Sequence, residues 1–366
     1  MKISEIKELI KAQLEMPDED RIVLCLVGQQ GIGKTQAIQQ VAKEKGWDYK
    51  ALYGAQAQVE DLMGIPQISK NEGGKIETDF AKPVFLPSQE KTIFVLEEIN
   101  RAQLDVQQAV LQLLTDKKIG PHNLPKNTLI IISINPAGDN NIYNVDELDP
   151  VFINRICTIN IEADKDDWVK YAIEKDFNDK IVNFINNEGE WLSVKPTQDK
   201  IGKALPSPRT WELASKILKM VEKNNNLEGN LIDVLSGVIG QNAAETFVSR
   251  MNRPIPVKGE EIATKYDENI KNRLNSQNNS EMYFTRIDLI SYLNKNKNNI
   301  NKKEIENILR TLTDINENKS MEFISSFISE YTNNKFEELL GFDNIDKSLV
   351  EKVLQILDRI NVEYEK

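Results

Sequence analysis

Two short stretches of this sequence carry residues whose types and spacing suit phosphate chemistry. The first, GQQGIGKT at residues 28–35, has the spacing G-x-x-x-x-G-K-T and follows the apolar run RIVLCLV (21–27). Glycines in such a loop allow its N–H groups to point at phosphate oxygens, and the start of the next helix adds partial positive charge. We expect Lys34 to reach the β- and γ-phosphates of a nucleoside triphosphate and Thr35 to hold Mg²⁺ through its hydroxyl. The Asn-Lys-x-Asp element of many GTPases is absent, which favours ATP.

The second stretch, TIFVLEEINRA (92–102), ends an apolar run in two adjacent carboxylates. We expect Glu97 to interact with Mg²⁺ and its water shell, and Glu98 to act as general base on the attacking water. Their mutual repulsion is relieved if the cation and Lys34 lie in the same site. A further apolar run, TLIIISI (128–134), is followed by Asn135, which is well placed to hold the attacking water.

Two arginines are further candidates. Arg155 ends a short helical stretch in LDPVFINRI (148–156), from which a cation could reach out of its domain. Arg209 lies in the first turn of a predicted helix (209–221), where a cation opposes the helix dipole unless an anion lies opposite. For each arginine, a surface ion pair is the alternative.

These residues need a scaffold, and the hydrophobic pattern predicts one. Short apolar runs alternate with helical segments such as 35–46, which indicates a parallel sheet covered by helices on both faces. After residue 163 the strand signals stop and helical patterns take over. We predict an α/β nucleotide-binding domain with an N-terminal helix (1–163), a helical domain (164–252) and a helical C-terminal region (253–366). The predicted strands are 21–27, 48–53, 92–96, 128–134 and 156–161.

Composition narrows the possible functions. The chain has 366 residues, a formal net charge of −11 and a pI near 5.0, which disfavours general binding to the phosphate backbone of nucleic acids. One histidine, His122, leaves too few imidazoles for a histidine metal site. Cys25 and Cys157 lie in apolar runs and are expected to be buried, reduced thiols. No signal peptide and no run of about 18 apolar residues is found, so we expect a cytoplasmic protein without a membrane span.

In order, GQQGIGKT, FVLEEINRA, IISINPAG, LDPVFINRI and LPSPRTW resemble Walker A, Walker B, sensor 1, arginine finger and sensor 2 of the AAA+ ATPases. The string EINRA, with DLMGIP (61–66) and KKIGPHNLPKNT (117–128), is similar to the MoxR-like, dynein-related branch. The resemblance covers about residues 20–250 and implies a P-loop NTPase core with a five-stranded parallel sheet, a helical lid over 164–252, and ATP and Mg²⁺ as ligands. It also implies a homo-oligomeric ring, most often a hexamer. One departure is Glu97, because this position is usually Asp.

The resemblance implies a role for each matched residue. Glu98 would be the catalytic base, Asn135 would position water, Arg155 would be a finger acting on the neighbouring subunit, and Thr35 and Glu97 would serve the metal. The inserts 66–83 and 117–128 would face the ring pore or a client, with plain surface hairpins as the alternative. The nucleotide-binding residues would be Gly28, Gln29, Gln30, Gly31, Ile32, Gly33, Lys34, Thr35, Gln36 and Arg209.

Three functions stay open on sequence alone. The first is a ring ATPase that remodels or activates a partner protein, such as one with a von Willebrand factor A domain. The second is a nucleic-acid motor or restriction-type NTPase, for which Lys70, Lys75, Lys117 and Lys118 would line the pore. The third is a nucleotide-gated assembly scaffold in which Glu97 slows turnover.

Overall fold

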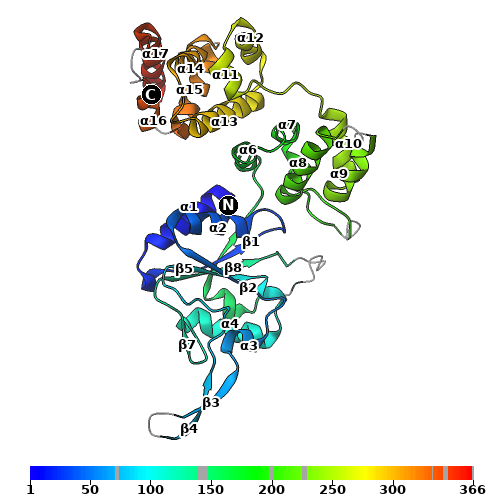
Figure 1. Ribbon diagram of the computed structural model, residues 1–366, viewed down its shortest axis with the longest axis vertical. Coiled ribbons are helices and arrows are strands. Elements are labelled where there is room, and N and C mark those ends of the chain that lie inside the picture. The colour runs from blue at the N-terminus through cyan, green and yellow to red at the C-terminus, as the bar shows by residue number, and fades with distance from the viewer. Residues whose placement is uncertain are drawn as a thin grey trace. The chain divides into compact units, whose positions relative to one another are not determined.

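The computed structural model of the chain forms two compact units (Figure 1). The first unit contains Met1–Asp164 and Ser193–Thr210, and the second contains Lys165–Leu192 and Trp211–Lys366. The structure describes residues 1–70, 74–137, 145, 147–197, 202–224, 229–315, 317–331, 333–340 and 345–364. The predicted division into three domains at 163 and 252 stays a prediction.

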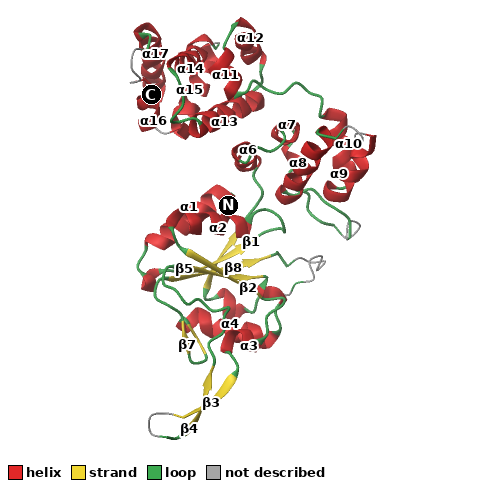
Figure 2. Cartoon of the chain, viewed as in Figure 1, coloured by secondary structure: helices red, strands yellow, loops and turns green. Residues whose placement is uncertain are grey.

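A five-stranded parallel sheet forms the centre of the first unit, as predicted (Figure 2). Its order is β2-β5-β8-β1-β9, and every neighbouring pair is parallel. The two strands TIFVLE and TLIIISI are buried along their whole length, as expected for strands with helices on both faces. The strands are β1 (Val23–Val27), β2 (Asp48–Tyr53), β5 (Thr92–Glu97), β8 (Thr128–Ile134) and β9 (Ile156–Asn160).

Helices cover both faces of this sheet. On one face, α1 (Ile3–Glu15) and α2 (Lys34–Lys45) bury apolar side chains such as Ile6 and Ile38 against β1, β5 and β8. On the other face, α3 (Val59–Met63) and α4 (Leu104–Asp116) pack on β5 and β8. Three-residue helical turns, η1 (Asp18–Asp20) and η2 (Ile99–Arg101), and the short helix α5 (Pro150–Ile153) complete the connections.

One expectation about the cysteines is wrong. Cys25, in the central strand β1, is buried, but Cys157 is exposed. Cys157 lies near the start of β9, which is an edge strand of the sheet as formed by the described residues. An apolar run alone does not distinguish an edge strand from a central one.

Two hairpins extend from the first unit. The β3–β4 hairpin (Pro66–Lys70 and Ile76–Phe80) is antiparallel, and its described residues are largely exposed (Figure 1). Residues 71–73 of the predicted insert lie outside the described residues. The shorter β6–β7 hairpin (Lys118–Ile119 and His122–Asn123) lies within the second predicted insert. His122 Nε2 lies 3.1 Å from the backbone oxygen of Met63, so it joins this hairpin to the end of α3.

The described part of the second unit is helical throughout. An aromatic cluster of Phe184, Trp211 and Phe247, with ring centroids 5.4 to 6.0 Å apart, joins α7, α8 and α10. The elements of this region are α6 (Lys165–Glu174), α7 (Asp179–Asn187), η3 (Gly189–Trp191), α8 (Pro208–Glu222), α9 (Leu231–Ile239) and α10 (Gln241–Arg250).

A bundle of further helices follows, as the apolar stripes in residues 305–357 predict. Ile305, Ile308 and Phe327 are completely buried, but Leu354 is exposed, which corrects its place in the predicted stripe. None of the described helices is long and apolar enough to cross a membrane. The helices are α11 (Gly259–Lys265), α12 (Glu268–Ser276), α13 (Asn279–Lys295), α14 (Lys302–Asp314), α15 (Glu317–Tyr331), α16 (Asn333–Leu340) and α17 (Lys347–Tyr364).

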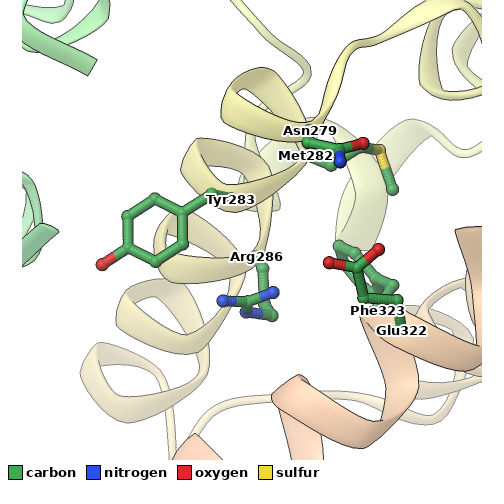
Figure 3. Close-up of a pocket in the computed structure, with 6 residues that line it drawn as sticks. All are labelled: Asn279, Met282, Tyr283, Arg286, Glu322 and Phe323. Carbon is green, nitrogen blue, oxygen red and sulfur yellow. The ribbon is translucent and has the colours of Figure 1, made fainter. Parts of the chain in front are cut away.

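A small pocket lies between α13 and α15 in this bundle. Figure 3 shows side chains of the two helices on either side of it, among them Tyr283, Arg286 and Phe323. Arg286 donates to both carboxylate oxygens of Glu330 at 3.3 Å and lies 5.1 Å from the centre of the Tyr283 ring. This arginine already has an anionic partner, so we assign the pocket no ligand.

Candidate nucleotide-binding site

The predicted phosphate loop connects the end of β1 to the start of α2. Gly33 is the N-cap of α2 and adopts a left-handed conformation, with φ of 102°, which glycine adopts without steric cost. Gly28 is required for space, because a Cβ there would lie 2.4 Å from Ile32 Cδ1 and 2.9 Å from the Ile161 oxygen. Ile32 itself is buried in the core, whereas Gln30 and Gln36 are exposed. The loop backbone and the start of α2 therefore form the expected cradle.

The Lys34 side chain lies inside this loop. Its Nζ donates to the backbone oxygens of Gly28 (2.6 Å) and Gln29 (3.1 Å) and to Oδ1 of Asn135 (3.4 Å). Burial lowers the pKa of Lys34 to about 8, although the charges of Glu97 and Glu98 oppose this shift. A partly desolvated ammonium group at this position is suited to bind phosphate oxygens.

Thr35 and Glu97 meet beside Lys34. Thr35 Oγ1 donates to Glu97 Oε1 across 2.5 Å, and the Glu97 side chain is buried at the end of β5. A hydroxyl and a carboxylate are hard oxygen ligands of the kind Mg²⁺ prefers, and Mg²⁺ usually takes its other ligands from phosphates and water. Among the described residues no cluster of three or more His, Cys, Asp or Glu could hold a metal. The residues present thus fit a metal shared with a nucleotide rather than a metal held by protein alone.

Glu98 lies one residue beyond the strand, in a left-handed conformation with φ of 52°. Its N–H donates to the Ser133 oxygen at 2.7 Å, which fixes the turn against β8. Arg101 Nη1 donates to Glu98 Oε2 at 3.0 Å. The sequence reasoning assigned relief of the Glu97–Glu98 repulsion to the metal and Lys34, and it missed Arg101. The spacing i, i+3 in a helical turn was the available signal.

Asn135 is buried and lies between two side chains of the site. Its Oδ1 faces Lys34, and its backbone oxygen accepts from Asn100 Nδ2 at 3.1 Å. Asn100 was part of the recognised EINRA string, but no residue pattern assigned it a contact. The structure therefore brings Lys34, Thr35, Glu97 and Asn135 together at the carboxyl edge of the sheet, where parallel α/β sheets bind ligands.

Arg155 lies away from this group. It precedes β9, whose first residue pairs with Val23 at the start of β1, whereas the phosphate loop follows Val27 at the other end of β1. Five residues of strand span roughly 16 Å. Arg155 Nε donates to Thr115 Oγ1 at 3.0 Å and Nη1 donates to the Val151 oxygen at 2.8 Å. It lies at the amino edge of the sheet, so it does not join the site of its own chain.

Arg209 approaches the phosphate loop through its backbone. Its N–H donates to the Gly31 oxygen at 3.1 Å, and a Cβ on Gly31 would lie 3.3 Å from Arg209 Cβ and 2.9 Å from Ser207 Oγ. Ser193 Oγ donates to Gln29 Oε1 at 3.0 Å. The segment Ser193–Thr210 of the first unit therefore packs on the loop at both of its ends. Sequence reasoning placed only Arg209 there.

With this geometry established, comparison with known proteins assigns a class to the domain. Residues 23–156 match the family model of the AAA domain (dynein-related subfamily). This span contains the phosphate loop, the two glutamates and Asn135. Residues 23–156 thus match an AAA domain, and the fold of the chain is that of the AAA+ P-loop NTPases.

The similar solved structures are distant. A mutant form of RuvB from Thermotoga maritima is 13% identical, with a TM-score of 0.37, over 66% of this chain and 69% of that chain. NtrX from Brucella abortus is 14% identical, with a TM-score of 0.33, over 87% of this chain and 67% of that chain. No curated protein matches the chain.

Proposed function

We propose that this chain is a MoxR-like AAA+ ATPase that binds and hydrolyses Mg-ATP between the subunits of a ring and thereby remodels or activates a partner protein. The observation that carries the proposal is the convergence of Lys34, Thr35, Glu97 and Asn135 at one edge of the sheet. The ammonium group can bind phosphate, the hydroxyl and carboxylate oxygens can coordinate Mg²⁺, and the amide can orient a water molecule. Phosphoryl transfer to water uses groups of these kinds.

Each residue has a distinct task in this proposal. Lys34 binds the phosphates, and the N–H groups of the loop donate hydrogen bonds to the same negatively charged oxygens. Glu98 accepts the proton of the attacking water, and Asn135 orients that water. The Thr35 hydroxyl and the Glu97 carboxylate would hold Mg²⁺, which neutralises phosphate charge when it is bound. Arg209 would sense the bound nucleotide. The hydrogen bond from its N–H to the Gly31 oxygen supports this role, because it holds Arg209 next to the phosphate loop.

The position of Arg155 supports a ring, which we propose to be a hexamer. Because Arg155 lies at the opposite edge of the sheet, it would serve the site of a neighbouring subunit. Its neighbours Val151 and Ile153 are exposed apolar residues, which suits a subunit contact. An arginine finger is worth about 10³- to 10⁵-fold in rate, so an isolated subunit should be a poor ATPase.

The hairpins are the proposed contact for a client protein, such as one with a von Willebrand factor A domain. Ile68 and Ile76 of the β3–β4 hairpin are 84% and 71% exposed. They lie on the same face of the hairpin, because Ile76 pairs with Lys70, which is two residues from Ile68 on the same strand. Apolar side chains held in water favour a protein partner over a nucleic acid. Lys117, a candidate for nucleic-acid contact, is instead paired with Asp18 at 3.0 Å.

A rate measurement tests this proposal. ATP hydrolysis per subunit should rise as the protein concentration increases, because assembly supplies Arg155 to each site. A rate per subunit that does not change with concentration would contradict the shared site. Stimulation of several-fold by nucleic acid at physiological salt would favour the nucleic-acid motor instead. Tight ATP binding without turnover at any concentration would favour the assembly scaffold.

A further inference from the structure

The turn that follows β5 is tied to the end of β8 by a side chain with no assigned role. Asn100 lies in η2 (Ile99–Arg101) and is 1% exposed. Its Nδ2 donates to the Asn135 backbone oxygen at 3.1 Å, and its Oδ1 has no hydrogen-bond partner within the described residues. A buried amide oxygen that lacks a hydrogen-bond partner lowers the stability of the fold. Packing alone therefore does not explain an asparagine at this position.

The backbone around Asn100 is held firmly. Glu98 N–H donates to the Ser133 oxygen at 2.7 Å, and Arg101 N–H donates to the Glu98 oxygen at 2.9 Å. The Asn100 amide thus extends from a fixed turn. It is a rigid support for the group that it contacts.

Asn135 needs support from outside its own segment. It follows the last residue of β8, and Pro136 comes next, which has no N–H to donate to a neighbouring strand. The bond from Asn100 holds the peptide group that joins Asn135 to Pro136. That peptide group is bonded directly to the Cα of Asn135, whose side-chain Oδ1 lies 3.4 Å from Lys34 Nζ.

We propose that Asn100 is a positioning residue that holds Asn135, so that the Asn135 amide faces the place where the terminal phosphate and the attacking water meet. The chain of contacts Asn100–Asn135–Lys34 links the turn after β5, the end of β8 and the phosphate loop. This inference rests on the proposed ATPase function, since it concerns the same site. Because Asn100 acts through Asn135, loss of its side chain should lower the turnover rate and leave the nucleotide affinity unchanged.

A double-mutant cycle tests this coupling. We expect Asn100→Ala to lower kcat by about 10-fold or more while the Kd for a non-hydrolysable ATP analogue stays within about two-fold. Asn135→Ala should show the same pattern. Asn100→Ala combined with Asn135→Ala should be no slower than Asn135→Ala alone, because the support has nothing left to hold.

Controls separate this role from general damage to the fold. Gln103→Ala, at an exposed position just after the same turn, should leave kcat unchanged. Asn100→Asp keeps the shape but presents an oxygen where Nδ2 donates, so it should lose turnover as Asn100→Ala does. If Asn100→Ala does not fold, Asn100→Ser, too short to reach Asn135, replaces it in the cycle.

Three results would overturn the inference: wild-type kcat in Asn100→Ala, a loss confined to nucleotide affinity, or fully multiplicative losses in the double variant. A wild-type protein without ATPase activity at any concentration would contradict the proposed function itself, which is a different outcome of the same assays.

Discussion

Thr35 and Glu97 are joined by a 2.5 Å hydrogen bond from the hydroxyl to the carboxylate. This bond connects the start of α2 to the end of β5, so the phosphate-binding and acidic halves of the site share one contact. AAA+ proteins usually have Asp at the position of Glu97, and a longer side chain could have missed the site. Here its carboxylate reaches the hydroxyl that would share the metal. The extra methylene group therefore does not remove Glu97 from the site.

Magnesium dependence should follow from this contact. Glu97→Gln keeps the size of the side chain but removes the negative charge, so it should raise the Mg²⁺ concentration for half-maximal ATP hydrolysis by about 10-fold or more. The measurement is a Mg²⁺ titration at saturating ATP, with full loss of activity on chelation. Glu90→Gln, an exposed acid just before the same strand, is the matched control. An unchanged titration curve in Glu97→Gln would remove Glu97 from the metal site.

The pH dependence of ATP binding should report on Lys34. Burial lowers the pKa of Lys34 from 10.5 to about 8, so the amine of the free protein loses its proton as the pH rises through that value. Only the protonated amine attracts phosphate, so ATP affinity should be highest well below pH 8 and decrease as the pH rises through that value. In Lys34→Arg the guanidinium stays charged, so the decrease should disappear even if the affinity is lower overall. A wild-type affinity that does not change up to pH 9.5, about 1.5 units above this pKa, would contradict the assignment.

The trans role of Arg155 predicts complementation between two inactive variants. Arg155→Ala removes the finger but keeps the nucleotide site, whereas Lys34→Met removes phosphate binding but keeps the finger. Each variant alone should be slower than the wild type by about 10³-fold or more. A mixture should regain activity, because some sites then combine an intact loop with an intact finger. No recovery, in mixtures shown to co-assemble, would argue against a shared site.

The fold could be predicted from sequence because its strongest signals are local. The runs TIFVL and TLIIISI are predominantly apolar, and the structure buries both strands completely. The phosphate loop was readable because glycine, lysine and threonine each do something there that other residues cannot. Glu97 and Asn135 could be predicted from their positions, because Glu97 ends one buried strand and Asn135 follows another.

What sequence reasoning missed depends on which strands are neighbours. Cys157 resembles a core residue until β9 is known to be the edge strand. The bond between Asn100 and Asn135 joins residues 35 positions apart and exists because β5 and β8 are adjacent. The contact of Ser193 with Gln29 spans 164 positions. A pattern of residue types along the chain does not encode such pairings.

The most direct test of the account is ATP binding and ATP hydrolysis measured together in Glu98→Gln. If Glu98 is the general base, this variant should bind Mg-ATP within about two-fold of the wild-type affinity and hydrolyse it at least about 10²-fold more slowly. Arg101, which donates to Glu98 Oε2, is unchanged in this variant and can donate to the amide oxygen of Gln. Hydrolysis by Glu98→Gln at the wild-type rate would contradict the central claim that this carboxylate activates water at the site.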